Sequence, residues 1–366
     1  MRENFILSRR IPCESRRVME APSLQPTYEE RPLASAPIRV GQWRQMEAYA
    51  AALPDNSPAT RPGAQAANGP GPGALRDSFR ANLGYPAPRF LGQASVRMEK
   101  VGEDATATYS RCWIQATPEM ETYGLYIVPR RTRAPTPLVI AVHGGGGFPE
   151  LATFNGGSNY NDMVRGSVGE GYVTFAPLAV MYPYVDRDHG TPIPPDVRGR
   201  IGARLEEGGT TLMGVEVTKI ARALDALEKR PEVDARRVAM IGLSYGGFYT
   251  LYAAAVDSRI RAAVASCSFR DRGPGAPPVI PELRETNMLG SADLAGLISP
   301  RALQVQCGIG DELFPIEFAR RAAVEARSHY PGALASAFDF QAFDGGHEFR
   351  GDVAWKFLRR EFGRMD

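Results

Sequence analysis

A lone serine stands between glycines in residues 242–246, which read Gly-Leu-Ser-Tyr-Gly. An apolar run over 237–243 precedes Ser244, and a stretch typical of a helix follows over 245–256. The G-x-S-x-G spacing is typical of a strand-to-helix turn that holds a serine hydroxyl out as a nucleophile. Glycines on either side let the strand and the helix approach without Cβ clashes. A purely structural turn is the alternative, and the strand before and the helix after favour the nucleophile.

A serine hydroxyl is a weak nucleophile at neutral pH and needs a general base, usually a histidine. The chain has four histidines, His143, His189, His329 and His347. We predict His347 as the base, because it lies in a glycine-rich stretch between the last strand-like run and the terminal helix. His329 is expected on the polar side of a helix and His189 in a surface loop. His143 precedes four glycines, which have a separate explanation.

The base in turn needs a carboxylate that fixes its tautomer and stabilises the imidazolium. Asp311 lies in the loop CGIGDELFP, between Ser244 and His347 in chain order. We predict Asp311 as this acid. Glu312, next to it, and Asp344, close to the histidine, stay open as alternatives.

Glycines 144–147 follow His143 at the end of an apolar run, PLVIAVHG. Glycines there expose backbone N–H groups, as in the HGGG-type loops that bind an oxyanion. We predict that this loop supplies one donor, and that the N–H of Tyr245, the residue after the serine, supplies the second. A phosphate-binding loop is the alternative, but neither a G-K-[ST] nor a G-x-G-x-x-G pattern accompanies these glycines.

The elements that must position these residues alternate between strand-like and helix-like runs. Nine strand-like runs cover 94–101, 106–115, 122–128, 137–144, 172–179, 237–244, 260–268, 302–308 and 335–343. The first three suggest antiparallel strands, and most of the others are continuous apolar runs typical of parallel strands covered on both faces. The clearest helix is predicted over 211–229, where apolar residues recur along one stripe. The pattern predicts a doubly wound, mostly parallel α/β sheet with an antiparallel start.

Residues 1–89 form a predicted N-terminal extension, and residues 90–366 form the predicted catalytic domain. The extension contains a Pro- and Gly-rich tract, ATRPGAQAANGPGPG, that is typical of a loop or linker. A short helix is predicted over 41–52. Its aromatic residues, Trp43 and Tyr49, would be poorly placed in water, so we expect packing on the main domain or on another subunit, as in a homo-oligomer.

A polar segment, 181–210, is expected to leave the sheet at its carboxyl edge, where ligands bind in such folds. Its side chains that suit an acyl or sugar site are Tyr182, Tyr184, Arg198 and Arg204. Two guanidinium groups there would favour an anionic substrate. A solvent-exposed loop without a ligand role explains the composition equally well.

The composition of the chain limits the partners and the location that can be expected. The 43 basic and 41 acidic residues are mixed along the chain, so nucleic acid is not an expected partner. No apolar run approaches the ~18 residues of a membrane span, and the first residues lack the apolar core of a secretory signal. The four cysteines show neither a disulfide framework nor a zinc spacing. Cys267 and Cys307 are expected to be buried, and a cytoplasmic location is expected.

The stretch 223–269, with its GLSYGG core, resembles the central part of bacterial α/β-hydrolases. The HGGG, GxGDELFP and GGHEF motifs follow the same family order, and the resemblance covers roughly 120–366. It is greatest to the dienelactone hydrolase-like and acetylxylan esterase-like (cephalosporin-C deacetylase) groups. The chain departs from these groups by a Ser where dienelactone hydrolase has Cys, and by lacking the Gln after the serine and the Arg-Gly-Gln signature of the deacetylases.

The resemblance implies a serine esterase that cleaves short-acyl or acetyl esters, including those of carbohydrates, without a metal or organic cofactor. Ser244, Asp311 and His347 would form its triad, and Tyr245 with Gly145 or Gly146 its oxyanion hole. The expected partner is a small-molecule ester. The alternatives are a peptidase or amidase like the catalytic domain of prolyl oligopeptidases, a non-catalytic binding module with a hydrolase fold, and an acyltransferase.

Overall fold

A computed structural model describes residues 27–54, 71–130, 135–145, 147–156, 158–180, 196–271 and 289–364. Within them, one sheet of nine strands has the order β1-β2-β3-β5-β4-β6-β7-β8-β9. The strands are β1 (Val96–Glu103), β2 (Ala107–Gln115), β3 (Glu121–Pro129), β4 (Thr136–Val142), β5 (Val173–Pro177), β6 (Val233–Leu243), β7 (Ala262–Ser266), β8 (Ala302–Gly308) and β9 (Phe338–Phe343). All nine predicted strands are therefore found, each within a few residues of its expected bounds.

The strands β1, β2, β3 and β5 pair antiparallel, and every pair from β5 through β4 to β9 is parallel. Every residue of β4, β5, β7 and β8 is buried, because helices cover both faces of this part of the sheet. The predicted α/β class, a mostly parallel sheet with an antiparallel start, is confirmed.

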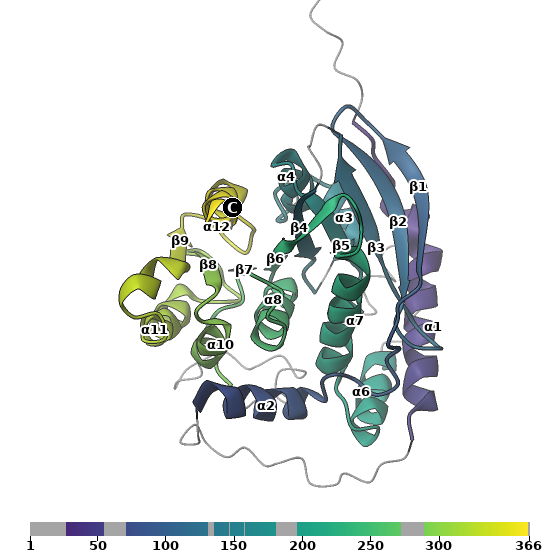
Figure 1. Cartoon of the computed structure of the whole chain (residues 1–366), viewed down its shortest axis with the longest axis horizontal. Coiled ribbons are helices and arrows are strands. Elements are labelled where there is room, and N and C mark those ends of the chain that lie inside the picture. Colours follow the sequence, from purple (N-terminus) through teal and green to yellow (C-terminus); the bar gives the residue numbers. More distant parts are fainter. Residues whose placement is uncertain are drawn as a thin grey trace, which may run out of the picture.

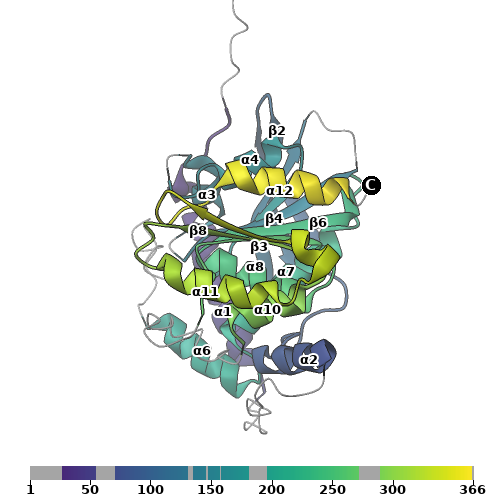
Figure 2. The ribbon, with the colours of Figure 1, turned by 90° about the vertical axis from the view of Figure 1, so that its left-hand side faces the viewer.

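Two layers of helices enclose the sheet (Figures 1 and 2). The larger helices are α1 (Ala36–Ala52), α2 (Gly71–Leu83), α6 (Val197–Glu207), α7 (Leu212–Leu227), α8 (Tyr245–Val256), α10 (Ser291–Ile298), α11 (Ile316–Arg327) and α12 (Gly351–Gly363). The shorter ones are α3 (Pro149–Phe154), α4 (Met163–Gly169) and the 3₁₀ turns η1 (Pro32–Ser35) and η2 (Gly332–Ala337). One face packs against α4 and α12, and the other against α7, α8, α10 and α11. In the part of the chain described, every helix is too short or too polar to cross a bilayer.

The polar segment 181–210 contains a helix in its second half. Apolar residues recur every fourth position in α6, and all three of them, Val197, Ile201 and Leu205, are buried against α1. The first half, 181–195, lies outside the described residues. The alternative of a solvent-exposed loop is therefore wrong for 197–207.

The N-terminal extension packs against the main sheet and its helices. Helix α1 starts at Ala36, five residues before the expected start, because Pro37 is tolerated in a first helical turn. Trp43 is 4 % exposed and Tyr49 is fully buried, so the prediction that these aromatic rings pack on the main domain is confirmed. The division of the chain at residue 89 stays a prediction.

Helix α2 docks onto the helices beneath the sheet at two places. The Thr211 hydroxyl caps α7 by accepting from the Gly214 N–H, and it donates to the carbonyl of Leu83 at the end of α2. A Cβ at Gly214 would lie 1.9 Å from that carbonyl oxygen, so only glycine permits this approach. Arg80 of α2 donates to the carbonyl of Val256 at 2.5 Å.

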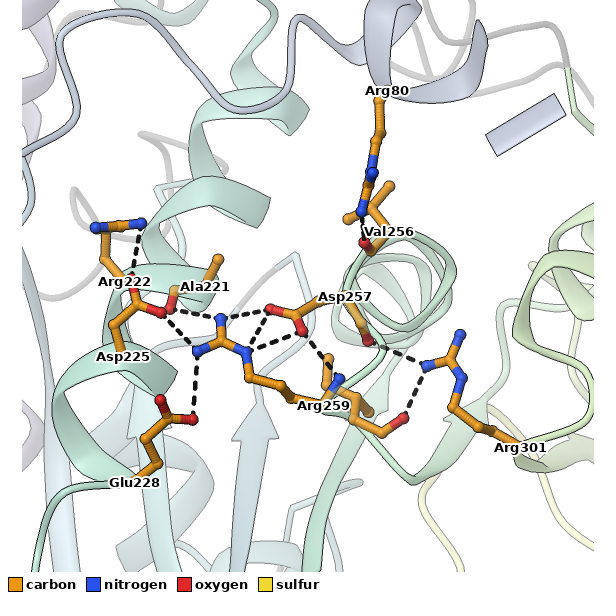
Figure 3. Close-up of polar contacts among 10 residues, drawn as sticks. Arg80, Ala221, Arg222, Asp225, Glu228, Val256, Asp257, Arg259 and Arg301 are labelled. Atoms are coloured by element: carbon orange, nitrogen blue, oxygen red, sulfur yellow. Dashed lines mark hydrogen bonds and ion pairs between the residues drawn. The ribbon is translucent and has the colours of Figure 1, made fainter. Parts of the chain in front are cut away.

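The C-terminal end of α8 is the second of these docking sites (Figure 3). The last carbonyls of a helix have no partner within it and carry the negative end of its dipole. Arg76 donates to Ala255 at 3.0 Å and to the carbonyl of Leu297 at 2.7 Å. Arg301 donates to the carbonyl of Ala254 at 2.6 Å. Guanidinium groups from α2 and from the loop before β8 thus close the end of α8.

Candidate active site

Ser244 occupies a strained turn between β6 and α8. Its backbone has φ 59° and ψ −116°, a conformation that costs a non-glycine residue roughly 1–3 kcal/mol and clusters at functional sites. The flanking glycines are required by contact. A Cβ on Gly242 would lie 2.2 Å from the Gly246 carbonyl oxygen, and one on Gly246 would lie 2.1 Å from the Val142 carbonyl oxygen. The strand–turn–helix setting predicted around the serine is present, and the Ser244 residue is partly exposed.

Asp311 and His347 are brought together at the carboxyl ends of β8 and β9. The imidazole Nδ1 lies 2.8 Å from the carboxylate Oδ2 of Asp311. The Asp311 side chain is 1 % exposed and the His347 side chain 20 % exposed, so the pair has a buried acid and an accessible ring. Asp311 Oδ1 also accepts from the N–H groups of Leu313 and Phe314, at 2.9 and 3.1 Å.

The charge of Asp311 is stabilised where it is buried. Burial by itself raises the pKa of this carboxyl, but the hydrogen bond and charge of His347 and the N–H of Phe314 outweigh it. The net pKa of Asp311 lies below its ordinary value, so the group is ionised at neutral pH. The Phe314 ring stacks on the imidazole, with centroids 5.6 Å apart and planes 17° apart, which holds the ring's orientation.

The serine turn and the histidine loop share one anchor, Ser266 at the end of β7. The Ser244 N–H donates to the Ser266 carbonyl at 2.8 Å. The Ser266 hydroxyl donates to the carbonyl of Glu348, the residue after His347, at 2.9 Å. The parallel pairing of β6, β7, β8 and β9 brings these strand ends to one edge of the sheet.

The glycine loop after β4 lies beside the serine. A Cβ on Gly144 would lie 3.5 Å from the Ser244 Cβ. Gly144 itself is occupied, because its N–H donates to the Tyr160 hydroxyl at 2.9 Å and its carbonyl accepts from the Gly147 N–H at 3.0 Å. The N–H groups of Gly144 and Gly147 thus have partners within the protein. Gly145, between them, is the predicted oxyanion donor that the described part of the loop contains.

The other predicted oxyanion donors are Gly146 and Tyr245. Gly146 lies outside the described residues. Tyr245 is the first residue of α8, where helical N–H groups form the positive end of the dipole.

His143 has a role that the sequence did not reveal. The imidazole is buried, its Nδ1 lies 2.8 Å from the Gly144 carbonyl, and its Nε2 accepts from the Ala179 N–H at 3.1 Å. These partners fix the neutral tautomer with the proton on Nδ1. Burial, with smaller effects of the Lys219 and Arg39 charges, lowers the pKa of His143 to about 4. A neutral His143 therefore braces the glycine loop.

The N-terminal extension reaches the same loop. The guanidinium carbon of Arg39, on α1, lies 3.9 Å from the ring centroid of Phe148, the residue after the four glycines. Arg39 is 1 % exposed and donates to the Ser35 hydroxyl at 2.6 Å. Position 39 carries no motif, so only the folded structure reveals this contact.

The residues predicted to line a substrate site lie in different surroundings. Arg198, on α6, is buried, and its guanidinium carbon lies 6.0 Å from the Tyr245 ring centroid, so it is near the serine turn. Arg204 donates to the Leu53 carbonyl at the end of α1 and pairs with Glu207 at 3.6 Å. These contacts give Arg204 a structural role. Tyr182, Tyr184 and His189 lie outside the described residues.

The alternative acids and bases are placed elsewhere. Glu312 and Asp344 are both exposed, whereas Asp311 is the carboxylate bonded to His347. His329 lies just after α11 rather than on the polar side of that helix. It is half-buried with its ring against Gly296 of α10, so its predicted solvated position was wrong.

Cys267, Asp311 and His347 form a group of potential metal ligands. The Asp311 carboxylate and the His347 Nδ1 are already bonded to each other. Burial raises the pKa of Cys267 to about 12, so the free thiol is protonated at neutral pH. The hydrogen-bonded Asp311–His347 pair is suited to proton transfer.

A doubly wound sheet with a serine at a strand–helix turn and an Asp–His pair at later strand ends defines the α/β-hydrolase superfamily. Within it, residues 93–271 match the family model described as acetyl xylan esterase (AXE1). The fold and this match identify the chain as a carboxylic-ester hydrolase. The resemblance to acetylxylan esterase-like hydrolases is confirmed.

The individual relatives are distant. The chain is 24 % identical to the YtaP protein of Bacillus subtilis (strain 168) over 277 residues, which are 70 % of this chain and 87 % of YtaP. A glucuronoyl esterase from Solibacter usitatus has a TM-score of 0.60 and 17 % identity, over 80 % of this chain and 92 % of that one. Acetyl Xylan Esterase 1 from Thermoanaerobacterium sp. JW/SL YS485 has a TM-score of 0.54 and 16 % identity, over 92 % and 100 %. At these identities the structures show a common fold.

Proposed function

We propose that this hydrolase cleaves short-acyl esters, foremost acetyl esters of carbohydrates, through an acyl-enzyme on Ser244. The observation that carries the proposal is the 2.8 Å bond between a buried, ionised Asp311 and the accessible ring of His347, anchored through Ser266 to the serine turn. An imidazole held in this way has the tautomer that can accept a serine proton.

In this mechanism Ser244 Oγ attacks the ester carbonyl while its proton passes to Nε2 of His347. Asp311 stabilises the imidazolium that forms. The negative charge that develops on the carbonyl oxygen is bound by the N–H groups of Tyr245 and the glycine loop. The intermediate then collapses, and the alcohol leaves with the proton from His347. Water, deprotonated by His347, attacks the acyl group and releases the acid.

Two lines of support point to a carbohydrate ester. The matching family model is described as acetyl xylan esterase, and the similar solved structures are described as glucuronoyl and acetyl xylan esterases. Hydrolysis of acetylated sugars is therefore the first activity to test.

We also infer that the protein works in a reducing compartment, the cytoplasm. Cys112, Cys267 and Cys307 are all buried as free thiols. Free thiols of this kind are usual where disulfides are kept reduced.

The test compares the parent with Ser244→Ala on acetylated sugars, short aryl esters, lactones and a peptide anilide. Ser110→Ala is the matched control, because Ser110 is equally half-buried but lies on β2, away from the site. The expected result is fluorophosphonate labelling and ester hydrolysis in the parent and the control, and neither in Ser244→Ala. Undiminished hydrolysis by Ser244→Ala would overturn the proposal. A preference for the anilide over every ester would replace the esterase with an amidase.

A further inference from the structure

Cys267 follows β7 directly and adopts a backbone conformation that favours glycine. Its φ is 49°, in the left-handed region, and its side chain is fully buried. The Cys267 N–H donates to the Gln306 carbonyl of β8 at 2.8 Å, which fixes the bend. A non-glycine residue persists in such a conformation only where its surroundings over-determine it.

The bend places the thiol between the acid loop and the base loop. The sulfur lies 3.4 Å from the carbonyl oxygen of Glu348 and 3.8 Å from that of Gly346, the two neighbours of His347. The sulfur, a carboxylate oxygen of Asp311 and a ring nitrogen of His347 all lie within 4.8 Å of one another. The thiol is therefore hydrogen bonded to the loop that carries His347 and lies within 4.8 Å of the Asp311 carboxylate.

Because burial raises its pKa to about 12, the thiol is protonated at neutral pH and is a neutral donor, not a nucleophile. A neutral hydrogen-bond donor beside a carboxylate stabilises the ionised form and adds no charge of its own. The thiol contact is among the interactions that lower the pKa of Asp311. The titratable groups that face the thiol are Asp311, His347 and the buried Cys307 on β8.

We propose that Cys267 is a positioning residue of the proposed triad, whose thiol spans the Asp311 and His347 loops and fixes the carboxylate against the imidazole. This inference rests on the proposed function. The cysteine acts through Asp311 and His347 and does not touch the substrate.

Removal of the thiol has two expected effects. The Asp–His geometry loosens, so kcat falls about tenfold while KM stays within about twofold, because ground-state binding is not altered. Asp311 retains more negative charge, which binds the imidazolium of His347 more tightly. The acid limb of the kcat/KM profile therefore moves to higher pH.

Three substitutions separate positioning from packing. Cys267→Ala removes the donor and the sulfur volume. Cys267→Gly also removes the donor, but it relieves the positive φ, so it folds even if the alanine variant does not. Cys267→Ser restores a donor and should recover most of the kcat and of the pH profile. Cys112→Ala is the control, since Cys112 is an equally buried thiol on the distant strand β2.

Ester hydrolysis, the pH profile and thermal unfolding are measured for each purified variant. A folded Cys267→Gly with parental kcat and an unmoved acid limb would overturn the inference, as would equal losses in Cys112→Ala. Fluorophosphonate labelling distinguishes failure of the proposed function from failure of the positioning role of Cys267. If the parent is not labelled at Ser244, the proposed function fails; if it is labelled and the Cys267 variants match it, only the positioning role fails.

Discussion

Arg39 of the N-terminal helix α1 stacks on Phe148, with its guanidinium carbon 3.9 Å from the ring centroid. Phe148 directly follows the glycine loop, and Arg39 is also one of the charges that keep His143 neutral. A helix at one end of the sequence thus supports the loop proposed to bind the oxyanion.

Arg39→Met should therefore lower kcat about tenfold with a smaller change in KM, because a buried cation–π contact contributes about 2 kcal/mol and its loss lets the loop shift. The measurement is steady-state hydrolysis of an aryl acetate. Arg97→Met is the control, since Arg97 stacks on Trp113 at 3.8 Å on the outer strands. Equal losses of kcat in both variants would contradict a specific effect of Arg39 on the glycine loop.

The free energy of unfolding should decrease as the pH is lowered, over a pH range set by His143. Its folded-state pKa is about 4, below the ordinary value of 6.5, because burial disfavours the charged form. The unfolded chain binds this proton first as pH falls, so stability is lost between about pH 6.5 and pH 4, by roughly 3 kcal/mol. Urea unfolding at pH 7, 5 and 4 measures this loss. His143→Gln should show a shallower slope, and identical slopes would remove His143 as the cause.

Among the acidic candidates, only Asp311 should prove essential. Asp311→Asn leaves the shape but removes the charge that fixes the tautomer of His347, and such a change lowers kcat by up to ~10⁴. Glu312→Gln and Asp344→Asn are the controls and should hydrolyse esters at nearly the parental rate, because both side chains are exposed. A large loss in either control with an active Asp311→Asn would reassign the acid.

The arginines at the end of α8 should matter for stability and not for turnover. Arg76→Ala removes two charged hydrogen bonds to the carbonyls of Ala255 and Leu297 and should cost about 2–3 kcal/mol in the free energy of unfolding. Its kcat should match that of the parent. Arg200→Ala is the control and should unfold like the parent, because the ion pairs of Arg200 with Asp196 and Glu47 lie at the surface. A loss of kcat without a loss of stability would contradict the structural role.

Much of the fold could be predicted from the sequence because its signals are local. Helix α8 was predicted over 245–256 and has those bounds, since the strand, the turn glycines and the helix formers are contiguous. Helix α6 was not predicted, although Val197, Ile201 and Leu205 are spaced at four-residue steps, because the Pro and Asp residues before it are typical of a loop.

Some contacts of the candidate site could likewise be predicted from the sequence, and others could not. The Asp311–His347 pairing was predicted because chain order constrains it, and the two side chains are hydrogen bonded. The catalytic roles of these residues stay predictions. The supports of the glycine loop were not predictable, because His143 depends on the backbone of Ala179 and Arg39 on the ring of Phe148. Those pairs meet only once the sheet and the N-terminal helix are assembled.

The arginine contacts of α2 have a practical consequence for anyone who would shorten this protein. A fragment starting at residue 90 would retain every motif of a hydrolase and still lack Arg76 and Arg80. The carbonyls of Ala255 and Val256 would then face water, at the far end of the same helix whose first turn follows Ser244. Deletions that remove α2 should therefore yield weakly folded protein.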